Sequence, residues 1–351
     1  MIRTVLSLLF LLVAAGFDCL ACTSAIVSAN VSRNGCPLLW KHRDSSKRDN
    51  FVDTVNCPDH RFDYIALFNA EDSLKHEAWA GVNRSGFAIM NTVAGNLKKN
   101  RPDWTDREGF IMTAALRCCI TVEDFHNFLD SLPRPLGVQT NFGVIDASGG
   151  GAYFETDDLG YRRYNLDEAP SGVLIRSNFS CSSNCQGGYG YDRYENAESV
   201  IAPLAERCEI SPKLFTETLS REFFNSRTGN ALTDKTTGKV RVEGFIPRPS
   251  SVSSIVIELT ENGPVMWTML GFPPVAVTYP VTFENIPESL RRNTLTGRSI
   301  ECDAAIERKS IIMDGKVLDI SKASDIISRQ KALSAENYRL FRNRKQENSR
   351  K

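Results

Sequence analysis

No part of the sequence is apolar for long enough to cross a bilayer as a helix. Such a helix needs roughly 20 apolar residues, whereas the longest apolar run, "VLSLLFLLVAAG", has about a dozen and lies near the amino terminus. An excess of one charge is also missing, because 42 Lys and Arg residues balance 42 Asp and Glu residues. The basic residues are scattered except near the carboxyl terminus, so we expect no nucleic-acid partner.

Motifs for cofactors and for a common hydrolytic triad are missing too. The chain has no phosphate-binding glycine motif and no internal repeat. Its four histidines, at positions 42, 60, 76 and 126, share no spacing, which argues against a Ser-His-Asp triad. "CSSNC" at 181–185 resembles half of a zinc site, but no second pair of ligands completes it. The sequence therefore predicts neither a metal nor an organic cofactor.

The apolar run has the features of a secretory signal. Arg3 provides the positive start, and "CLA" places small residues before a cleavable bond between Ala21 and Cys22. We therefore expect residues 1–21 to be removed and the protein to be exported, to the periplasm or the extracellular space, without an integral membrane segment. Residues 22–345 should form one domain that ends in a helical segment, followed by a basic tail at 346–351. Assembly into a homo-oligomer stays open.

Export permits disulfides, and the chain has 10 cysteines. Loss of Cys19 with the signal would leave nine, an odd number, so at least one thiol cannot pair within a monomer. Cys181 and Cys185 are close enough in sequence for a local bridge, but spacing alone fixes no connectivity. Cys22 would be the first residue of the mature protein.

Strand-forming segments come in pairs separated by turn residues. "TSAIVSANV", "SRNG" and "PLLWKHRD" predict a hairpin over residues 23–44 that places Cys22 at a strand end. Three more hairpins are predicted by "HEAWAGVNRSGFAIMNTVAG", "NFGVIDASGGGAYFETDD" and "SSIVIELTENGPVMWTMLG".

Helix-forming segments lie between and after the hairpins. They are "DREGFIMTAALRCCITVEDFHNFLDSL", with a capping signal in "TVED", and "YDRYENAESVIAPLAE", "SPKLFTETLSREFF" and "KASDIISRQKALSAENYRLFRN". Hairpin blocks separated by helical blocks predict an α+β fold, with antiparallel sheets and helices on their outer faces.

A cysteine at the cleavage site gains a base from the cleavage itself. A thiol with a pKa of about 8.5 is mostly protonated at neutral pH and needs a neighbouring base to become a nucleophile. An α-amino group titrates at about 7.7–8.0, whereas the same nitrogen in a peptide bond is not basic. Removal of residues 1–21 would therefore create a nucleophile and its base within one residue.

"CTSAIVSANVSRNGCPLLWKHRD" resembles the start of the cysteine-type N-terminal-nucleophile hydrolases. These include choloylglycine (bile-salt) hydrolase, penicillin V acylase, acid ceramidase and the isopenicillin N acyltransferase relatives. "GVNRSGFAIMNT", "IRSNF" and "YDRYENA" extend the resemblance over most of the first 210 residues. The resemblance implies a four-layer αββα sandwich of two antiparallel sheets flanked by helices. It also implies hydrolysis of the C–N bond of a linear amide, with a small-molecule N-acyl amide as substrate.

The resemblance assigns roles to individual residues. Cys22 matches the nucleophile, and its α-amine matches the base. Asp44 matches an aspartate that orients this amine. Asn91 in "IMNT" and Asn178 in "RSNF" match the two asparagines of an oxyanion hole, while Arg193 in "YDRY" matches an arginine that supports the nucleophile.

One position departs from the family pattern. Several relatives carry an arginine three residues before the aspartate, where this chain has Lys41. Strand alternation puts Lys41 and Arg43 on one face and Asp44 on the other. Register makes Lys41 the first choice for the cation beside Cys22, and Arg43 the second.

Three functions from different classes fit these residues. The first is an amidase that forms a thioester at Cys22 and hydrolyses it. The second is an acyltransferase that hands the acyl group of the same thioester to an amine, although an exported enzyme meets little acyl-CoA. The third is a lipoprotein lipidated at Cys22, but "CLAC" is a poor lipidation signal because Cys19 stands where a branched aliphatic residue is usual.

Overall fold

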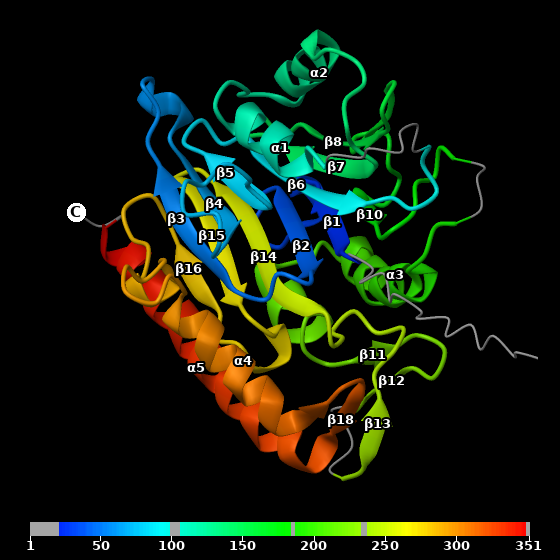
Figure 1. Ribbon diagram of the computed structural model, residues 1–351, viewed down its shortest axis with the longest axis vertical. Helices are drawn as coiled ribbons and strands as arrows, with labels where there is room; N and C mark the ends of the chain where they lie inside the picture. Colours follow the sequence, from blue (N-terminus) through cyan, green and yellow to red (C-terminus); the bar gives the residue numbers. More distant parts are fainter. Residues whose placement is uncertain (1–20, 99–105, 184–186, 233–236, 349–351) are drawn as a thin grey trace, which may run out of the picture.

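Two antiparallel sheets pack face to face in this protein, with helices outside both (Figure 1). The computed structural model describes residues 21–98, 106–183, 187–232 and 237–348. The predicted signal therefore lies outside the described residues except for Ala21, and so does Cys185 of the predicted local bridge. Within the described part of the chain, no helix is both long enough and apolar enough to cross a membrane.

The first sheet contains the strand that follows Cys22. Its strand order is β10-β1-β2-β14-β15-β16, and each neighbouring pair is antiparallel. The predicted hairpin over 23–44 is confirmed, with Ser24 opposite Lys41. The bounds are β1 (Thr23–Val27), β2 (Leu38–Asp44), β10 (Val173–Arg176), β14 (Ser251–Thr260), β15 (Gly263–Leu270) and β16 (Tyr279–Val281).

The second sheet is a meander in which sequence neighbours are also neighbours in space. Two of its hairpins, β5–β6 and β7–β8, are those that the sequence predicted. The sequence reading did not identify its strands β3, β4 and β9. The bounds are β3 (Asn50–Val55), β4 (Tyr64–Asn69), β5 (Ala80–Asn83), β6 (Ala88–Val93), β7 (Thr140–Ile145), β8 (Gly151–Thr156) and β9 (Tyr161–Asn165).

Three buried apolar layers hold the sheets and helices together. Between the sheets, Ile26 and Leu39 pack with Met90 of the second sheet. Outside the second sheet, a layer around Phe125 joins it to α1 (Glu108–Leu116) and α2 (Val122–Ser131). Outside the first sheet, a layer around Trp40 joins it to α3 (Tyr191–Glu206) and α5 (Ile320–Asn348). The α+β class and the αββα order of layers are therefore confirmed.

The helices follow the sequence signals in most places. Thr121 caps α2, and its hydroxyl and the Asp124 carboxylate each accept a hydrogen bond from the other residue's backbone, as "TVED" predicted. The helix α5 runs to Asn348, three residues into the predicted tail. A helix, α4 (Ile300–Ile312), was not predicted, because its apolar residues form no single stripe.

One predicted helix has a different geometry. In "SPKLFTETLSREFF" the segment Leu214–Leu219 is a π-helix, and the Ser220 amide donates to the Phe215 carbonyl, five residues back. This wider turn brings the Ser220 hydroxyl within 2.8 Å of the Ser254 hydroxyl on β14. The segment therefore anchors the outer face of the first sheet.

Short elements complete the chain. A small sheet, in the order β13-β18-β17, lies at the end of the molecule beside α4 and α5 (Figure 1). The remaining bounds are β11 (Phe224–Asn225), β12 (Asn230–Ala231), β13 (Lys239–Arg241), β17 (Met313–Asp314) and β18 (Val317–Asp319), with 3₁₀ turns at Ala29–Val31, His60–Phe62, Pro273–Val275 and Glu288–Leu290.

Candidate active site

Cys22 stands immediately before β1, at the edge of the layer between the two sheets. It is buried, with 5% of its surface exposed, and lines a cavity of about 270 Å³. Lys41 and Arg43 from β2 line the same cavity, together with Asn91 from β6 and Trp79 directly before β5. The sheet pairing that sets the hairpin register thus brings a thiol and two cations to one space.

Lys41 and Arg43 point from β2 toward the second sheet. The Lys41 amine donates to the Asn91 side-chain oxygen at 2.5 Å and to the Trp79 carbonyl at 2.7 Å. The Arg43 guanidinium donates to Asn50 at 2.6 Å and Asn69 at 2.9 Å, and lies 4.7 Å from the Trp79 ring centre. All of these acceptors are neutral, so neither cation has its charge cancelled by the groups that hold it.

Burial is the main influence on the pKa values of Lys41 and Arg43. It lowers the pKa of Lys41 to about 8, and a Cys22 thiolate would act in the opposite direction by favouring the ammonium form. Burial likewise lowers the pKa of Arg43 to about 10, again opposed by a charge on Cys22. The charged form of each cation is therefore favoured by a negative charge on Cys22.

Asn91 connects Lys41 to a buried carboxyl group that the sequence reading did not identify. Its side-chain nitrogen donates to Glu108, the first residue of α1. Burial raises the pKa of Glu108 well above its ordinary value, and the nearby charge of Lys41 opposes this rise. The chain Lys41–Asn91–Glu108 fixes the amide of Asn91 at both of its polar ends.

Arg193 holds the backbone of Cys22 from the helical side. One of its terminal nitrogens donates to the Cys22 carbonyl at 2.6 Å and to the Thr23 hydroxyl at 2.8 Å. The other donates to the Asn178 side-chain oxygen at 2.7 Å. The Ser177 hydroxyl adds a second hydrogen bond to the Cys22 carbonyl, at 3.3 Å. Arg193 thus fixes the position of the Cys22 backbone, and its role beside a nucleophile stays a prediction.

Gly190 leaves the space that the Arg193 side chain occupies. It precedes α3 with φ of +88°, a conformation that favours glycine. A Cβ atom at this position would lie 2.1 Å from an Arg193 nitrogen and 2.3 Å from the Ser177 hydroxyl. Both the backbone and the packing therefore require glycine directly before the "YDRY" segment.

Asn178 is buried between the two sheets. Its side-chain nitrogen donates to the Val93 carbonyl at 2.8 Å, while its oxygen accepts from Arg193. These contacts place Asn178 in the same hydrogen-bonded group as the Cys22 backbone. Its role in an oxyanion hole stays a prediction.

Asp44 lies on the opposite face of β2, as strand alternation predicted. Its carboxylate accepts from the Ser251 hydroxyl at 2.6 Å and from Arg248 at 2.8 Å. Only its backbone carbonyl faces the Cys22 thiol, with Sγ and O 3.9 Å apart. A β-bulge between Ser251 and Ser253 turns Ser251 to the outer face, where it can reach Asp44. The predicted contact between this carboxylate and the Cys22 amine stays a prediction.

His42 takes part in the same outer network. Its ring nitrogens lie 3.2 Å from the Ser220 hydroxyl and 2.8 Å from the Ser251 hydroxyl. Burial lowers the pKa of His42 to about 4, so its ring is neutral at physiological pH. Ser251 thus joins His42 to Asp44, and the expected absence of a Ser-His-Asp triad stays a prediction.

The structure places four of the predicted residues around one cavity, namely Cys22, Lys41, Asp44 and Asn91. Arg193 and Asn178 join them through the hydrogen bonds of Arg193 to the Cys22 carbonyl and to Asn178. The structure adds partners that the sequence reading missed, namely Trp79, Glu108, Ser177, Arg248 and Ser251. Each of these reaches the site through pairing of strands or packing of helices that are distant in sequence, so no local pattern marked them. Among the described residues, no group of three or more potential ligands could hold a metal ion.

Comparison with known proteins gives distant structural similarity only. No protein-family model matches the chain, and no curated protein matches its sequence. A structure of an N-acylethanolamine-hydrolyzing acid amidase ortholog from Caenorhabditis elegans is 15% identical, covers 67% of this chain and 92% of its own, and gives a TM-score of 0.44. The penicillin V acylase of Agrobacterium tumefaciens is 9% identical, with coverage of 76% and 87% and a TM-score of 0.41.

A mutant form of the conjugated bile acid hydrolase from Clostridium perfringens is also similar. It is 12% identical, covers 75% of this chain and 90% of its own, and gives a TM-score of 0.38. The bile acid hydrolase and the penicillin V acylase are two of the enzyme types that the sequence resemblance named. At these identities and TM-scores the similarity assigns neither a substrate nor a reaction to this chain.

Proposed function

We propose that this protein is an exported cysteine amidase that cleaves the linear amide bond of a small N-acyl substrate. Removal of residues 1–21 exposes the α-amine of Cys22, which accepts the thiol proton. The thiolate then attacks the amide carbonyl carbon, and the negative charge passes to the carbonyl oxygen. Collapse of this intermediate breaks the C–N bond, the ammonium returns the proton to the leaving amine, and a thioester remains on Cys22.

Water completes the reaction. The free α-amine takes a proton from water, whose oxygen attacks the thioester carbonyl. The C–S bond breaks, the carboxylic acid leaves, and the thiol regains its proton. Each cycle thus converts one amide and one water into one acid and one amine, with no other reactant.

The position of Cys22 is the observation that carries this proposal. Arg193 and Ser177 bind its carbonyl oxygen, while the same residue lines a cavity with Lys41 and Arg43. A thiol whose backbone is fixed by hydrogen bonds, and whose cavity contains two cations, suits a nucleophile that must be ionised and kept in place.

A screen for amine release tests the proposal. The substrates are N-acyl amino acids and conjugated bile acids, and the variants are Cys22→Ala and Cys118→Ala. We expect Cys22→Ala to lose activity by at least about 10³-fold because the nucleophile is gone. Cys118→Ala removes an exposed thiol outside the site and should retain turnover.

Circular dichroism should show that both variants are folded. Equal turnover by Cys22→Ala and wild type would refute the nucleophile assignment. Acyl transfer to an added amine, without release of the acid, would instead assign the thioester to a transferase.

A further inference from the structure

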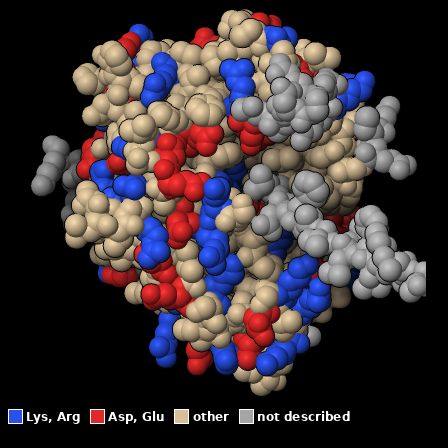
Figure 2. All heavy atoms as spheres, viewed as in Figure 1, with Lys and Arg blue, Asp and Glu red and all other residues tan. Residues whose placement is uncertain are grey.

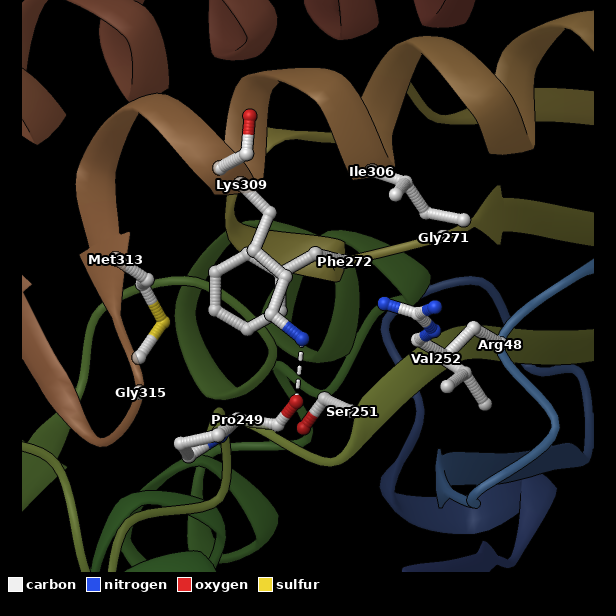
Figure 3. Close-up of a pocket in the computed structure, with 11 residues that line it drawn as sticks. Arg48, Pro249, Ser251, Val252, Gly271, Phe272, Ile306, Lys309, Met313 and Gly315 are labelled. Atoms are coloured by element: carbon white, nitrogen blue, oxygen red, sulfur yellow. Dashed lines mark hydrogen bonds between the residues drawn. The ribbon is translucent and has the colours of Figure 1, made fainter.

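A second cavity lies at one end of the first sheet, and Cys22 does not line it. It has a volume of about 310 Å³ and is bounded by the start of β14, the turn after β15 and one side of α4. We call it the α4 cavity. Figure 3 shows the residues that line it, which include Arg48, Val252, Phe272, Ile306, Lys309 and Met313.

The walls of the α4 cavity combine apolar surface with positive charge. Val252 and Phe272 are buried parts of the core, and Met313 adds a flexible apolar side chain. Lys309 and Arg48 are the charged residues of the lining, which contains no Asp or Glu. In a chain with equal numbers of acidic and basic residues, this local balance differs from that of the whole protein. The cavity therefore favours an anion that also has an apolar part.

The surrounding face of the protein shows how basic side chains gather. In Figure 2, Lys and Arg side chains form a column near the middle of the view, with Asp and Glu side chains mainly to its left. Salt bridges occupy several basic residues near the cavity, among them Arg248 with Asp44 and Lys316 with Glu243. Within the described residues, no carboxylate lies within salt-bridge distance of Arg48 or Lys309.

Lys309 reaches into the cavity from α4. Its amine donates to the Pro249 carbonyl and lies 5.0 Å from the Phe272 ring centre (Figure 3). Burial lowers the pKa of Lys309 to about 8, and the charge of Arg48 lowers it further, while Asp44 acts in the opposite direction. An ammonium has three donors, so this group can bind a ligand without giving up its carbonyl partner.

We propose that the α4 cavity binds a small organic acid, with its carboxylate between Lys309 and Arg48 and its apolar chain against Phe272 and Met313. A carboxylate matches the fork of a guanidinium and relieves the cost of keeping an ammonium away from water. Inorganic phosphate would satisfy the cations but leave the apolar wall unused. This site is separate from the proposed reaction at Cys22, and its occupation does not require that reaction.

Calorimetric titration tests the inference with two matched probes. The first is 4-phenylbutyrate, and the second is 4-phenylbutanol, which has a similar shape but no charge. We expect the acid to bind and the alcohol to bind at least about tenfold more weakly, since charge-assisted hydrogen bonds are lost. Inorganic phosphate should bind more weakly than the acid. No binding of the acid at millimolar concentration would refute the proposal.

Variants locate the binding. Lys309→Met and Arg48→Gln should each weaken binding of the acid at least about tenfold. The control is Lys316→Met, because this lysine lies outside the α4 cavity and its amine contacts Glu243 at 2.8 Å. The Lys316→Met variant should bind the acid with the affinity of the wild type.

Two outcomes would contradict the assignment. One is unchanged affinity for the acid in Lys309→Met or in Arg48→Gln. Because Arg48 is exposed, Arg48→Gln can still be measured if Lys309→Met does not fold. The other is a loss of affinity in Lys41→Met that Lys309→Met does not share, which would place the acid beside Cys22. Neither outcome bears on Cys22-dependent amide cleavage, which the amine-release screen measures separately.

Discussion

The two faces of β2 carry polar residues of opposite character. On the face toward the second sheet, Lys41 and Arg43 bind neutral oxygens and line the cavity of Cys22. On the face toward the helices, Asp44 is bound by Arg248 and by Ser251, which also contacts His42. One strand thus supplies cations that are hydrogen-bonded to neutral oxygens on one side, and a carboxylate that is paired with a guanidinium on the other.

This difference separates a group that can act on a new charge from one that holds structure. A buried cation held by neutral acceptors keeps its field available for an anion that forms beside it. A carboxylate that already accepts hydrogen bonds from a guanidinium and a hydroxyl interacts more weakly with any further charge. We therefore expect changes to the inner face to affect catalysis first, and changes to the outer face to affect stability first.

Among changes to the two faces of β2, the largest effect should come from Lys41→Met. Loss of the cation beside Cys22 should lower kcat/KM by about 10²–10³-fold, because thiolate and oxyanion lose electrostatic support. Thermal unfolding should change little, since the lost hydrogen bonds are offset by removal of a desolvated charge. Kinetic assays and melting curves measured on one preparation give both values.

Arg248→Gln is the matched change on the outer face. It leaves Asp44 without its cation and should reduce the free energy of unfolding by about 1–3 kcal/mol, with less than a tenfold effect on kcat/KM. A variant pair in which Arg248→Gln loses more activity than Lys41→Met would reverse the comparison.

Asn178→Ala should lower kcat by about 10²-fold with a smaller change in KM, if its amide supports the developing oxyanion. The Asn178→Asp variant separates this effect from loss of the Arg193 contact, because it keeps an oxygen for the guanidinium and removes the nitrogen donor. Steady-state kinetics that show raised KM and unchanged kcat in both variants would place Asn178 in substrate binding.

The hairpins could be predicted because their signals are local. In "NRSG" the turn residues lie between alternating apolar segments, and the structure has β5 and β6 there. By contrast, β3 has Asp53 and Thr54 side by side, which breaks the alternation that identifies strands. In β4 the residues before Asn69 form a continuous apolar run, which does not distinguish a strand from a buried helix. The π-helix at Leu214–Leu219 has the composition of an α-helix, so its wider turn is a consequence of tertiary packing.

The site divides in the same way. Strand alternation alone places the side chains of Lys41 and Asp44 on opposite faces of β2, and this part of the prediction is confirmed. The partner of Asn91, by contrast, is Glu108 at the start of α1, and the segment between them includes residues outside the described ranges. The β-bulge that turns Ser251 toward Asp44 depends on pairing with β2, which the sequence of β14 does not reveal.

Gly190→Ala should lower both the stability and the activity of the protein. The added Cβ would displace Arg193 from the Cys22 carbonyl, so unfolding free energy should fall by about 2–4 kcal/mol and activity should fall with it. The control is Gly149→Ala, since φ there is +93° but nothing lies within 4 Å of the added atom.

Gly149→Ala should show only backbone strain, of about 1 kcal/mol, and full activity. Urea titrations and amine-release assays on the two variants measure both quantities. Equal loss of stability in the two variants would mean that displacement of Arg193 does not contribute to the loss in Gly190→Ala.

The smallest effect should come from Glu108→Gln and appear mainly in pH dependence. Because burial raises the pKa of Glu108, its stabilising contribution is fully present below about 4.3, the ordinary pKa, and is lost as pH rises through the higher pKa of the folded protein. Each unit of this rise corresponds to about 1.4 kcal/mol. Glu108→Gln should flatten the fall of stability in this range, as measured by urea unfolding at several pH values. An unchanged slope would contradict the assignment.

Amide cleavage by a protein with a defined amino terminus tests the central claim most directly. Two forms are compared, one beginning at Cys22 and one retaining Ala21, with intact mass spectrometry to confirm each terminus and the absence of lipid. The account predicts turnover only by the form that begins at Cys22, because retention of one residue converts the basic amine into an amide while the fold stays the same. Equal turnover by the two forms would contradict it.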